Sequence, residues 1–228
     1  MPSSEPRLLR WSFLGRLSYP EAERMQSRLR DRVRESADGD YLLLLEHPHV
    51  YTLGRNAGRE DILVDEGWLS RKEATIFDCD RGGRVTYHGP GQLVGYPIVD
   101  LSPDRRDLRR YVRDLQEVLV RVLADLGVAA EPRHKTEEIG VWVGDQKIAS
   151  IGVHVSRWIT THGFALNLAT DLSYFAGIVP CGLEGVQMTS VEALTGRKPR
   201  LEEVSAQVVA HFCELFERRS RRVEPGAL

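Results

Sequence analysis

Two side chains in this sequence could form a nucleophile and its partner. The candidate partner is Lys147. It opens an apolar strand pattern that ends at Val155, in a chain that holds only four lysines. Side chains alternate along a strand, so Lys147 is expected on the apolar face with Ala149, Ile151 and Val153. Because burial disfavours the charged ammonium, such a lysine needs a partner. A lysine at the strand's start that simply reaches into water is the alternative, and the pattern by itself favours it.

The second side chain is Cys181, which lies between Pro180 and Gly182. These neighbours force an irregular backbone, and a thiol displayed from a loop suits a nucleophile. A buried cysteine that acts as a small apolar side chain is the commoner alternative. Cys213 fits that alternative, and Cys79 is ambiguous. Three cysteines without a CxxC pair argue against a disulfide framework and against a cysteine-rich zinc site.

The third candidate is the glycine-rich segment from Arg81 to Gln92. It matches neither GxxxxGK[ST] nor GxGxxG, so it is not a phosphate loop. We expect a glycine-rich hairpin with a functional arginine, tyrosine and histidine, and a structural turn with a surface histidine stays open. The chain has no GxSxG nucleophile elbow. His47 and His49, two apart around a proline, do not have the spacing of zinc ligands.

The hydrophobic pattern predicts one mixed α/β (α+β) domain over residues 1–228, with a mixed or antiparallel sheet flanked by helices. Ser102 is expected to cap the longest helix, Gly163 to form a bulge, and the tail at about 218–228 to be frayed. Helices are expected over Pro20–Glu35, Pro103–Leu126 and Leu201–Leu215, with a short one after Thr189, and strands over Tyr41–Leu45, Val50–Leu53, Ala74–Phe77, Ile139–Val143, Lys147–Val155 and Trp158–Leu168.

Composition excludes several classes of protein. The net charge of −2 predicts no strong attraction to nucleic acid or to an anionic membrane. No stretch approaches the length of an apolar membrane span, and the N-terminal residues lack the apolar run of a signal peptide. We therefore expect a cytoplasmic protein with no nucleic-acid or membrane partner.

Several blocks together resemble the octanoyl-[acyl-carrier-protein]:protein N-octanoyltransferases, also called lipoate-protein ligase B. The similarity covers roughly residues 40–195, and several blocks in register are more specific than any single motif. The blocks are Glu46-His-Pro, Thr52-Leu-Gly-Arg55, Arg81-Gly-Gly, Thr86-Tyr-His88, Gly91-Gln92, Tyr96-Pro97, Gly140-Val-Trp-Val143, Lys147 to Gly152, His162 to Asn167 and Pro180-Cys-Gly182.

This resemblance implies a fold similar to the catalytic domains of lipoate and biotin protein ligases. It also implies octanoyl transfer from acyl carrier protein, through a cysteine thioester, to a lysine of a lipoyl domain. The acceptors would be the E2 subunits of 2-oxo acid dehydrogenases and the glycine cleavage H protein, with no cofactor and no metal. The family's nucleophile falls on Cys181 and its catalytic lysine on Lys147. Its substrate-binding residues fall on Arg81, Gly82, Gly83, Arg84, Val85, Thr86, Tyr87, His88, Ser150, Ile151, Gly152, Gly163, Phe164 and Ala165.

The sequence departs from the family's pattern at two places, and two alternative functions are weighed against the resemblance. His49 stands where the family usually has proline, and the segment from Arg133 to Glu138 is unusually charged. An ATP-dependent lipoate or biotin ligase is one rival, but the GRGRxG loop of biotin ligases is absent. A non-catalytic module that binds an acyl chain or a carrier protein is the other rival, and it has no use for Lys147 on an apolar strand face.

Overall fold

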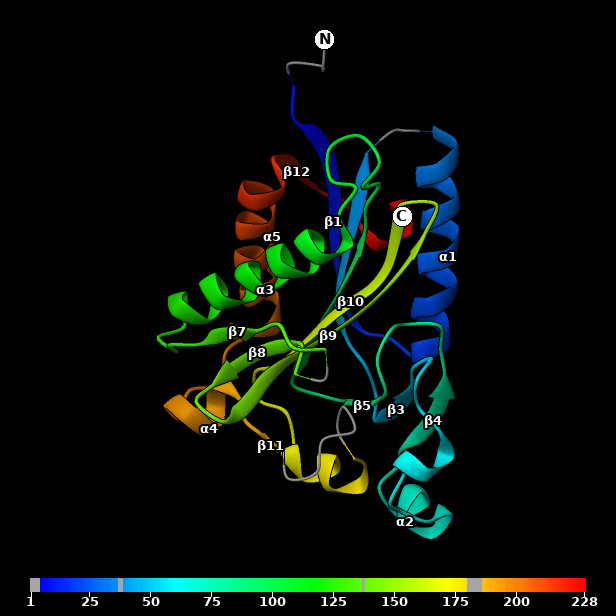
Figure 1. Ribbon diagram of the computed structural model, residues 1–228, viewed down its shortest axis with the longest axis vertical. Coiled ribbons are helices and arrows are strands. Elements are labelled where there is room, and N and C mark those ends of the chain that lie inside the picture. The colour runs from blue at the N-terminus through cyan, green and yellow to red at the C-terminus, as the bar shows by residue number, and fades with distance from the viewer. Residues whose placement is uncertain (1–4, 37–38, 137, 180–185) are drawn as a thin grey trace.

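A large mixed sheet forms the centre of the molecule. The computed structural model describes residues 5–36, 39–136, 138–179 and 186–228. The strands of the sheet are β1 (Arg7–Arg16), β2 (Asp40–Glu46), β6 (Gln92–Ile98), β7 (Glu131–Arg133), β8 (Gly140–Val143), β9 (Gln146–Ser156), β10 (Ile159–Asn167), β11 (Gln187–Met188) and β12 (Arg218–Arg222). Their order is β12-β1-β2-β6-β10-β9-β8-β7, and β11 pairs with β9 (Figure 1).

Helices cover both faces of this sheet. Helix α1 (Tyr19–Ser36) lies on one face, and α3 (Leu108–Asp125) and α5 (Leu201–Phe216) lie together on the other (Figure 1). Strand β2 is buried on both sides, which explains its continuous apolar run. Leu42 and Leu44 belong to the core under α3 and α5, whereas Leu43 and Leu45 pack on the α1 side. The predicted mixed α/β fold, with a sheet between helices, is confirmed.

A second, three-stranded sheet lies beside the first. It consists of β4 (Thr75–Asp78), β3 (Val50–Leu53) and β5 (Val85–His88), in that order. Helix α2 (Glu66–Arg71) and the 3₁₀ segment Leu172–Gly177 contribute to the apolar cluster of this sheet.

The expected glycine-rich hairpin is therefore wrong. Strand β5 pairs with β3, while β6 pairs with β2 and β10, so the two strands belong to different sheets. The chain crosses between the sheets at Gly91, which has φ +79° and packs against the Ala169 carbonyl. A side chain at this position would clash, so the glycine serves a crossover rather than a hairpin turn.

The start predicted for the helix over Pro103–Leu126 is also wrong. Helix α3 begins at Leu108 and is capped by the Asp107 side chain, which accepts from the Arg110 N–H. The residues before it make tertiary contacts instead, because Asp104 pairs with Arg218 at 2.7 Å and Arg105 donates to the Leu215 carbonyl. A cap pattern reports local preference, and these long-range contacts override it.

The predicted fraying of residues 218–228 is wrong. Residues Arg218–Arg222 form β12, which pairs in parallel with β1 at the edge of the sheet. Arg218 is buried and holds the equally buried Asp40 at 2.8 Å. The run Arg-Arg-Ser-Arg-Arg carries no hydrophobic signal that would predict a strand. The strand is held instead by backbone pairing with β1 and by the buried ion pair of Arg218 with Asp40. The assignment of residues 1–228 to a single domain stays a prediction.

A short helix completes the description. Helix α4 (Val191–Thr195) confirms the short helix expected after Thr189, although Ser190 rather than Thr189 is its cap. No helix among the described residues is both long enough and apolar enough to cross a bilayer.

The Arg218–Asp40 ion pair yields a stability prediction. Arg218→Ala should lower the free energy of unfolding by about 3–5 kcal/mol, because it leaves the Asp40 carboxylate buried with less compensation. Arg221→Ala, at an exposed position of the same strand, should change it by less than about 0.5 kcal/mol. Urea unfolding of the two variants measures the difference, and equal values would show that the tail adds no specific stability.

Candidate active site

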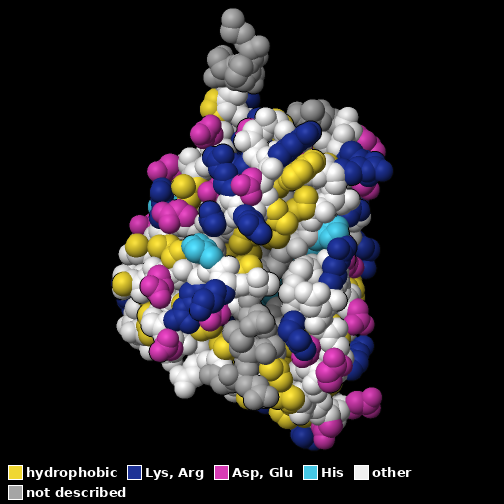
Figure 2. All heavy atoms as spheres, viewed as in Figure 1, with side chains coloured by type: hydrophobic (Ala, Val, Ile, Leu, Met, Phe, Trp, Pro, Cys, Tyr) yellow, Lys and Arg dark blue, Asp and Glu magenta, His cyan; other side chains and the backbone are white. Residues whose placement is uncertain are grey.

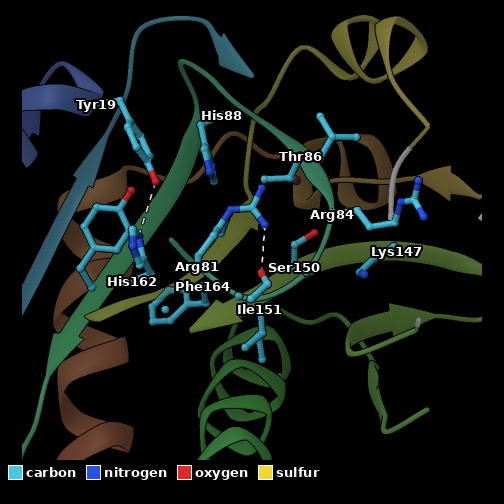
Figure 3. Close-up of a pocket in the computed structure, with 17 residues that line it drawn as sticks. Tyr19, Arg81, Arg84, Thr86, His88, Lys147, Ser150, Ile151, His162 and Phe164 are labelled. Atoms are coloured by element: carbon cyan, nitrogen blue, oxygen red, sulfur yellow. Dashed lines mark hydrogen bonds between the residues drawn. The ribbon is translucent and has the colours of Figure 1, made fainter. Parts of the chain in front are cut away.

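A cavity lies where the two sheets meet, between strands β9 and β10 on one side and the segment from Arg81 to β5 on the other (Figure 3). Its empty volume is about 510 Å³, part of which is open to solvent. It is lined by Tyr19, Arg81, Gly82, Gly83, Arg84, Val85, Thr86, His88, Tyr96, Lys147, Ser150, Ile151, Gly152, His162, Gly163, Phe164 and Ala165. The structure thus gathers one region from five separate parts of the chain.

Most of the residues singled out in the sequence line this cavity, with two exceptions. Tyr87 is buried in the core of the small sheet, and its hydroxyl lies 2.7 Å from His49 Nδ1. Tyr87 faces away because it alternates with Thr86 and His88 along β5. Cys181 falls in the segment 180–185, which lies outside the described residues.

Lys147 is almost completely buried, with 1% of its surface exposed. Its Nζ atom lies 5.5 Å from the centre of the Trp142 ring. The side chain passes over Gly140, where an added Cβ would lie only 2.6 Å from Lys147 Cε. Glycine at position 140 therefore leaves the space that the lysine occupies.

The predicted partners of Lys147 on its strand face are partly wrong, because Ile151 lines the same cavity but Ala149 and Val153 do not. The pairing of β8 with β9 shifts by one residue between Val141 and Trp142, which is a β-bulge. A bulge interrupts the alternation of side chains, so the face assigned from Val153 does not extend to Lys147. Lys147 lines the cavity with Ser150, while Ala149 and Val153 pack in the core under α3.

Both flanks of the segment 180–185 are attached to residues at this cavity. On one side, the Val179 N–H donates to the Asp61 carbonyl at 3.1 Å, and the Asp61 side chain pairs with Arg84 at 2.7 Å. On the other side, Met188 pairs with Lys147 in the parallel contact of β11 with β9. The described residues on the two sides of Cys181 are thus linked to Arg84, through Asp61, and to Lys147.

Arg81 forms part of the cavity wall and is nearly buried. Its guanidinium donates to the side chain and carbonyl of Thr52 and to the Gly82 carbonyl. Among the described residues, all of these acceptors are neutral oxygens. The Gly82 N–H donates to the Val153 carbonyl, which fastens this loop to β9. A Cβ on Gly152 would lie 2.9 Å from the Gly82 carbonyl oxygen, so glycine permits this close approach.

Two buried histidines are neutral, and of these His88 lines the cavity whereas His47 lies behind its wall. Burial lowers the pKa of His47 to about 4, and it lowers the pKa of His88 well below its ordinary value. His47 Nδ1 lies 2.7 Å from the Leu17 carbonyl, which can only accept, so Nδ1 carries the proton. Nε2 therefore accepts a hydrogen bond from the Tyr96 hydroxyl at 2.8 Å. This bond fixes the orientation of Tyr96 in the wall.

His162 occupies one end of the cavity. Its Nε2 lies 2.7 Å from Asp80 Oδ1, and the Tyr19 hydroxyl lies 3.5 Å from Nδ1 (Figure 3). The hydrogen bond with His162 lowers the pKa of Asp80 to about 2. The bulge expected at Gly163 is wrong, because Gly163 pairs with Gly152 in unbroken register and the left-handed residue is His162, with φ 56°.

Three lining residues were missing from the residues singled out in the sequence: Tyr19, Tyr96 and His162. Tyr96 and His162 lie inside blocks that carry the family resemblance, so the signal was present. Tyr19 lies at the start of α1, and nothing in the sequence near it signals a site. As for metals, the described parts of the chain contain no group of three His, Cys, Asp or Glu side chains that could hold an ion.

Comparisons with known proteins give the family. The lipoyl protein ligase A/B catalytic domain matches residues 18–213. A protein named octanoyltransferase from Solibacter usitatus is 50% identical over 204 residues, which cover 90% of this chain and 91% of that protein. The chain therefore belongs to the octanoyltransferases of this domain family, and it is an acyltransferase.

Solved structures agree at the level of the fold. A bipartite lipoate protein ligase from Thermoplasma acidophilum is 20% identical, with a TM-score of 0.74 over 98% of this chain and 89% of that one. A biotin protein ligase from Aquifex aeolicus is 12% identical, with a TM-score of 0.53 over 92% and 70%. The predicted similarity to the catalytic domains of lipoate and biotin ligases is confirmed.

The buried His47 yields a prediction for pH. Between about pH 6.5 and 4 the unfolded chain binds a proton at His47 that the native protein does not. The free energy of unfolding should therefore fall as the pH falls through this window, by about 3 kcal/mol from His47. In His47→Gln the fall should be smaller by roughly that amount. Urea unfolding at several pH values measures it, and an identical profile in the variant would contradict the assignment.

Proposed function

We propose that this octanoyltransferase moves an octanoyl group from acyl carrier protein, through a thioester on Cys181, to a lysine of a lipoyl domain. The observation that carries the proposal is the buried amine of Lys147 in the wall of a cavity with room for an acyl chain. Strand β11, which follows the segment of Cys181, pairs with the strand of Lys147. Membership in the family indicates that the acyl group is octanoyl and that the reaction is acyl transfer.

The first half-reaction is a thioester exchange. The Cys181 thiolate attacks the carbonyl carbon of the octanoyl thioester, the bond to the carrier's sulfur breaks, and that sulfur leaves with the electron pair. A cation beside the thiol favours its thiolate form, and Lys147 fills this role. Lys147 then gives its proton to the departing thiolate of the carrier, so the step ends with a neutral amine and acyl-Cys181.

The second half-reaction forms the amide. The amine of the acceptor lysine attacks the acyl-Cys181 carbonyl, and the Cys181 sulfur leaves as a thiolate. The neutral Lys147 amine accepts the proton that the attacking nitrogen loses, which restores the thiolate–ammonium pair. Transfer from a thioester to an amine is downhill, so the proposed route uses no ATP, cofactor or metal.

The cavity supplies the space for the acyl chain. In the proposed complex, the substrate contacts come from the Arg81–His88 segment, Ser150–Gly152 and Gly163–Ala165, with Tyr87 acting behind the wall. Glycines at the close approaches let the backbone lie against the chain, and oriented backbone N–H groups could hold the developing oxyanion. Small-molecule sites are usually apolar, with a few polar groups that fix the orientation of the ligand, and this cavity fits that description.

The partners follow from the same chemistry. The donor is octanoyl-acyl carrier protein, and the acceptors are the lipoyl domains of 2-oxo acid dehydrogenase E2 subunits and the glycine cleavage H protein. On the face shown in Figure 2, Lys and Arg side chains lie in several groups among Asp and Glu side chains. Such cations suit an acidic carrier protein. A cytoplasmic location is part of the proposal, and the absence of a disulfide framework in the sequence supports it.

The thioester intermediate gives a direct prediction. Incubation with octanoyl-carrier protein and no acceptor should add the mass of one octanoyl group to Cys181. Cys181→Ala should carry no adduct, whereas Cys213→Ala, which changes a thiol at the α5 core, should keep it. Intact mass and peptide mapping measure both, and an adduct elsewhere or on neither protein would exclude the covalent route.

The proton-transfer role of Lys147 gives a second prediction. Lys147→Arg keeps the positive charge but cannot readily give up its proton, so transfer to the acceptor lysine should slow by about 100-fold or more. Lys135→Arg, on the surface, should keep the normal rate. Single-turnover rates of acyl-Cys181 with the acceptor domain measure this, and a normal rate in Lys147→Arg would contradict the role.

A further inference from the structure

A second cavity lies directly behind His162. It is formed between α1 and β10, and its empty volume is about 660 Å³, part of which is open to solvent. His162 lines both cavities, so its side chain stands between them. Gln26 Nε2 and Thr161 Oγ1 are buried in the lining of the second cavity without a hydrogen-bond partner among the described residues. This space is polar, and a hydrocarbon chain would be unfavourable there.

The His162 ring is held firmly in this position. Asp80 Oδ1 lies 2.7 Å from Nε2, and Tyr19 Oη lies 3.5 Å from Nδ1. The backbone is also fixed, because the His162 N–H donates to Gln26 Oε1 at 2.7 Å. Tyr96 meets the ring edge to face, with 6.1 Å between the ring centres. The ring therefore forms a rigid wall between the two cavities.

The distance from Lys147 to this wall matches the length of an eight-carbon chain. Lys147 Cε lies beside Gly140, and Gly140 pairs with Ser150, so the lysine side chain reaches to the level of Ser150. His162 pairs with Val153, three residues farther along β9. Three strand residues span about 10 Å. Seven C–C bonds of about 1.5 Å, set at tetrahedral angles, let an extended octanoyl chain span about 9 Å.

The two residues also lie at opposite ends of the cavity. Figure 3 shows Lys147 at one end and Tyr19 and His162 at the other, with Ser150 and Ile151 between them. A chain attached near the lysine and extended along β9 would therefore meet the imidazole with its terminal methyl group.

We propose that the His162 ring ends the acyl chamber and sets the longest acyl chain that the enzyme accepts. The inference rests on the proposed function, since it assigns the eight-carbon limit of that reaction to one side chain. A longer chain would have to displace a ring held by Asp80 and Tyr19, or enter the polar cavity behind it. Removing the ring opens new space next to the rings of Tyr19 and Tyr96, which an apolar chain can occupy.

The test uses two variants chosen for the left-handed backbone at position 162. Glycine and asparagine both tolerate this conformation and are smaller than histidine. In His162→Gly and His162→Asn, the ratio of kcat/KM for ten- and twelve-carbon donors to that for the octanoyl donor should rise by about tenfold. The binding of free decanoate and dodecanoate, relative to octanoate, should strengthen by a similar factor in calorimetry.

The matched control is His154→Ala. His154 Nε2 also faces Asp80, at 3.6 Å, but His154 lines neither cavity. This variant should keep the wild-type preference for chain length. An equal shift of the chain-length ratio in His154→Ala would mean that a substitution beside Asp80 loosens the cavity in general. That result would overturn the inference.

Two further outcomes separate this inference from the proposed function. If alkanoate binding shifts in the His162 variants while no protein forms an acyl-Cys181 adduct, the chamber assignment stands and the covalent function fails. If the wild type forms the adduct but the variants keep its chain-length ratios, the role of His162 is wrong. The wild type alone is also decisive, because tighter binding of dodecanoate than of octanoate would exclude a wall at this position.

Discussion

The site depends on a one-residue shift in the pairing of β8 and β9. Strict alternation would place Lys147 with Ala149 and Val153 in the core under α3, but the shift turns its side chain into the cavity. The space that it enters exists because residue 140 is glycine. A bulge is a local departure from regular pairing, and here it redirects the Lys147 side chain while both strands stay in the sheet.

Among the cations of the cavity wall, Arg84 pairs with the Asp61 carboxylate, whereas Arg81 hydrogen-bonds to uncharged oxygens of Thr52 and Gly82. His47 and His88 are kept neutral by burial, so they shape the wall without adding charge. An anion that forms during acyl transfer would therefore meet positive charge in a region of low dielectric, where electrostatic interactions are stronger than in water.

The cavity lies where the two sheets approach each other, and glycines permit the close contact of their backbones. The loop at Gly82 bonds to Val153 of β9, and its carbonyl approaches Gly152 too closely for any other residue. The opposite end is closed by Tyr19 from α1 and by His162 from β10. One end thus carries the amine and the other a wall of aromatic rings, which gives the space a direction along β9.

The sequence by itself determined the class of fold, the longer helices, the apolar strands and most of the lining, because hydrophobic periodicity and short blocks of residues are local signals. The family resemblance led to Lys147, which lines the cavity, and the comparisons established the family. The direction of the Lys147 side chain, the split of the glycine-rich segment between two sheets and the pairing of the charged tail with β1 were decided by tertiary structure. Each depends on backbone pairing between distant segments or on a buried ion pair. Tyr19 joined the site for the same reason, since only the packing of α1 against β10 brings it to the cavity.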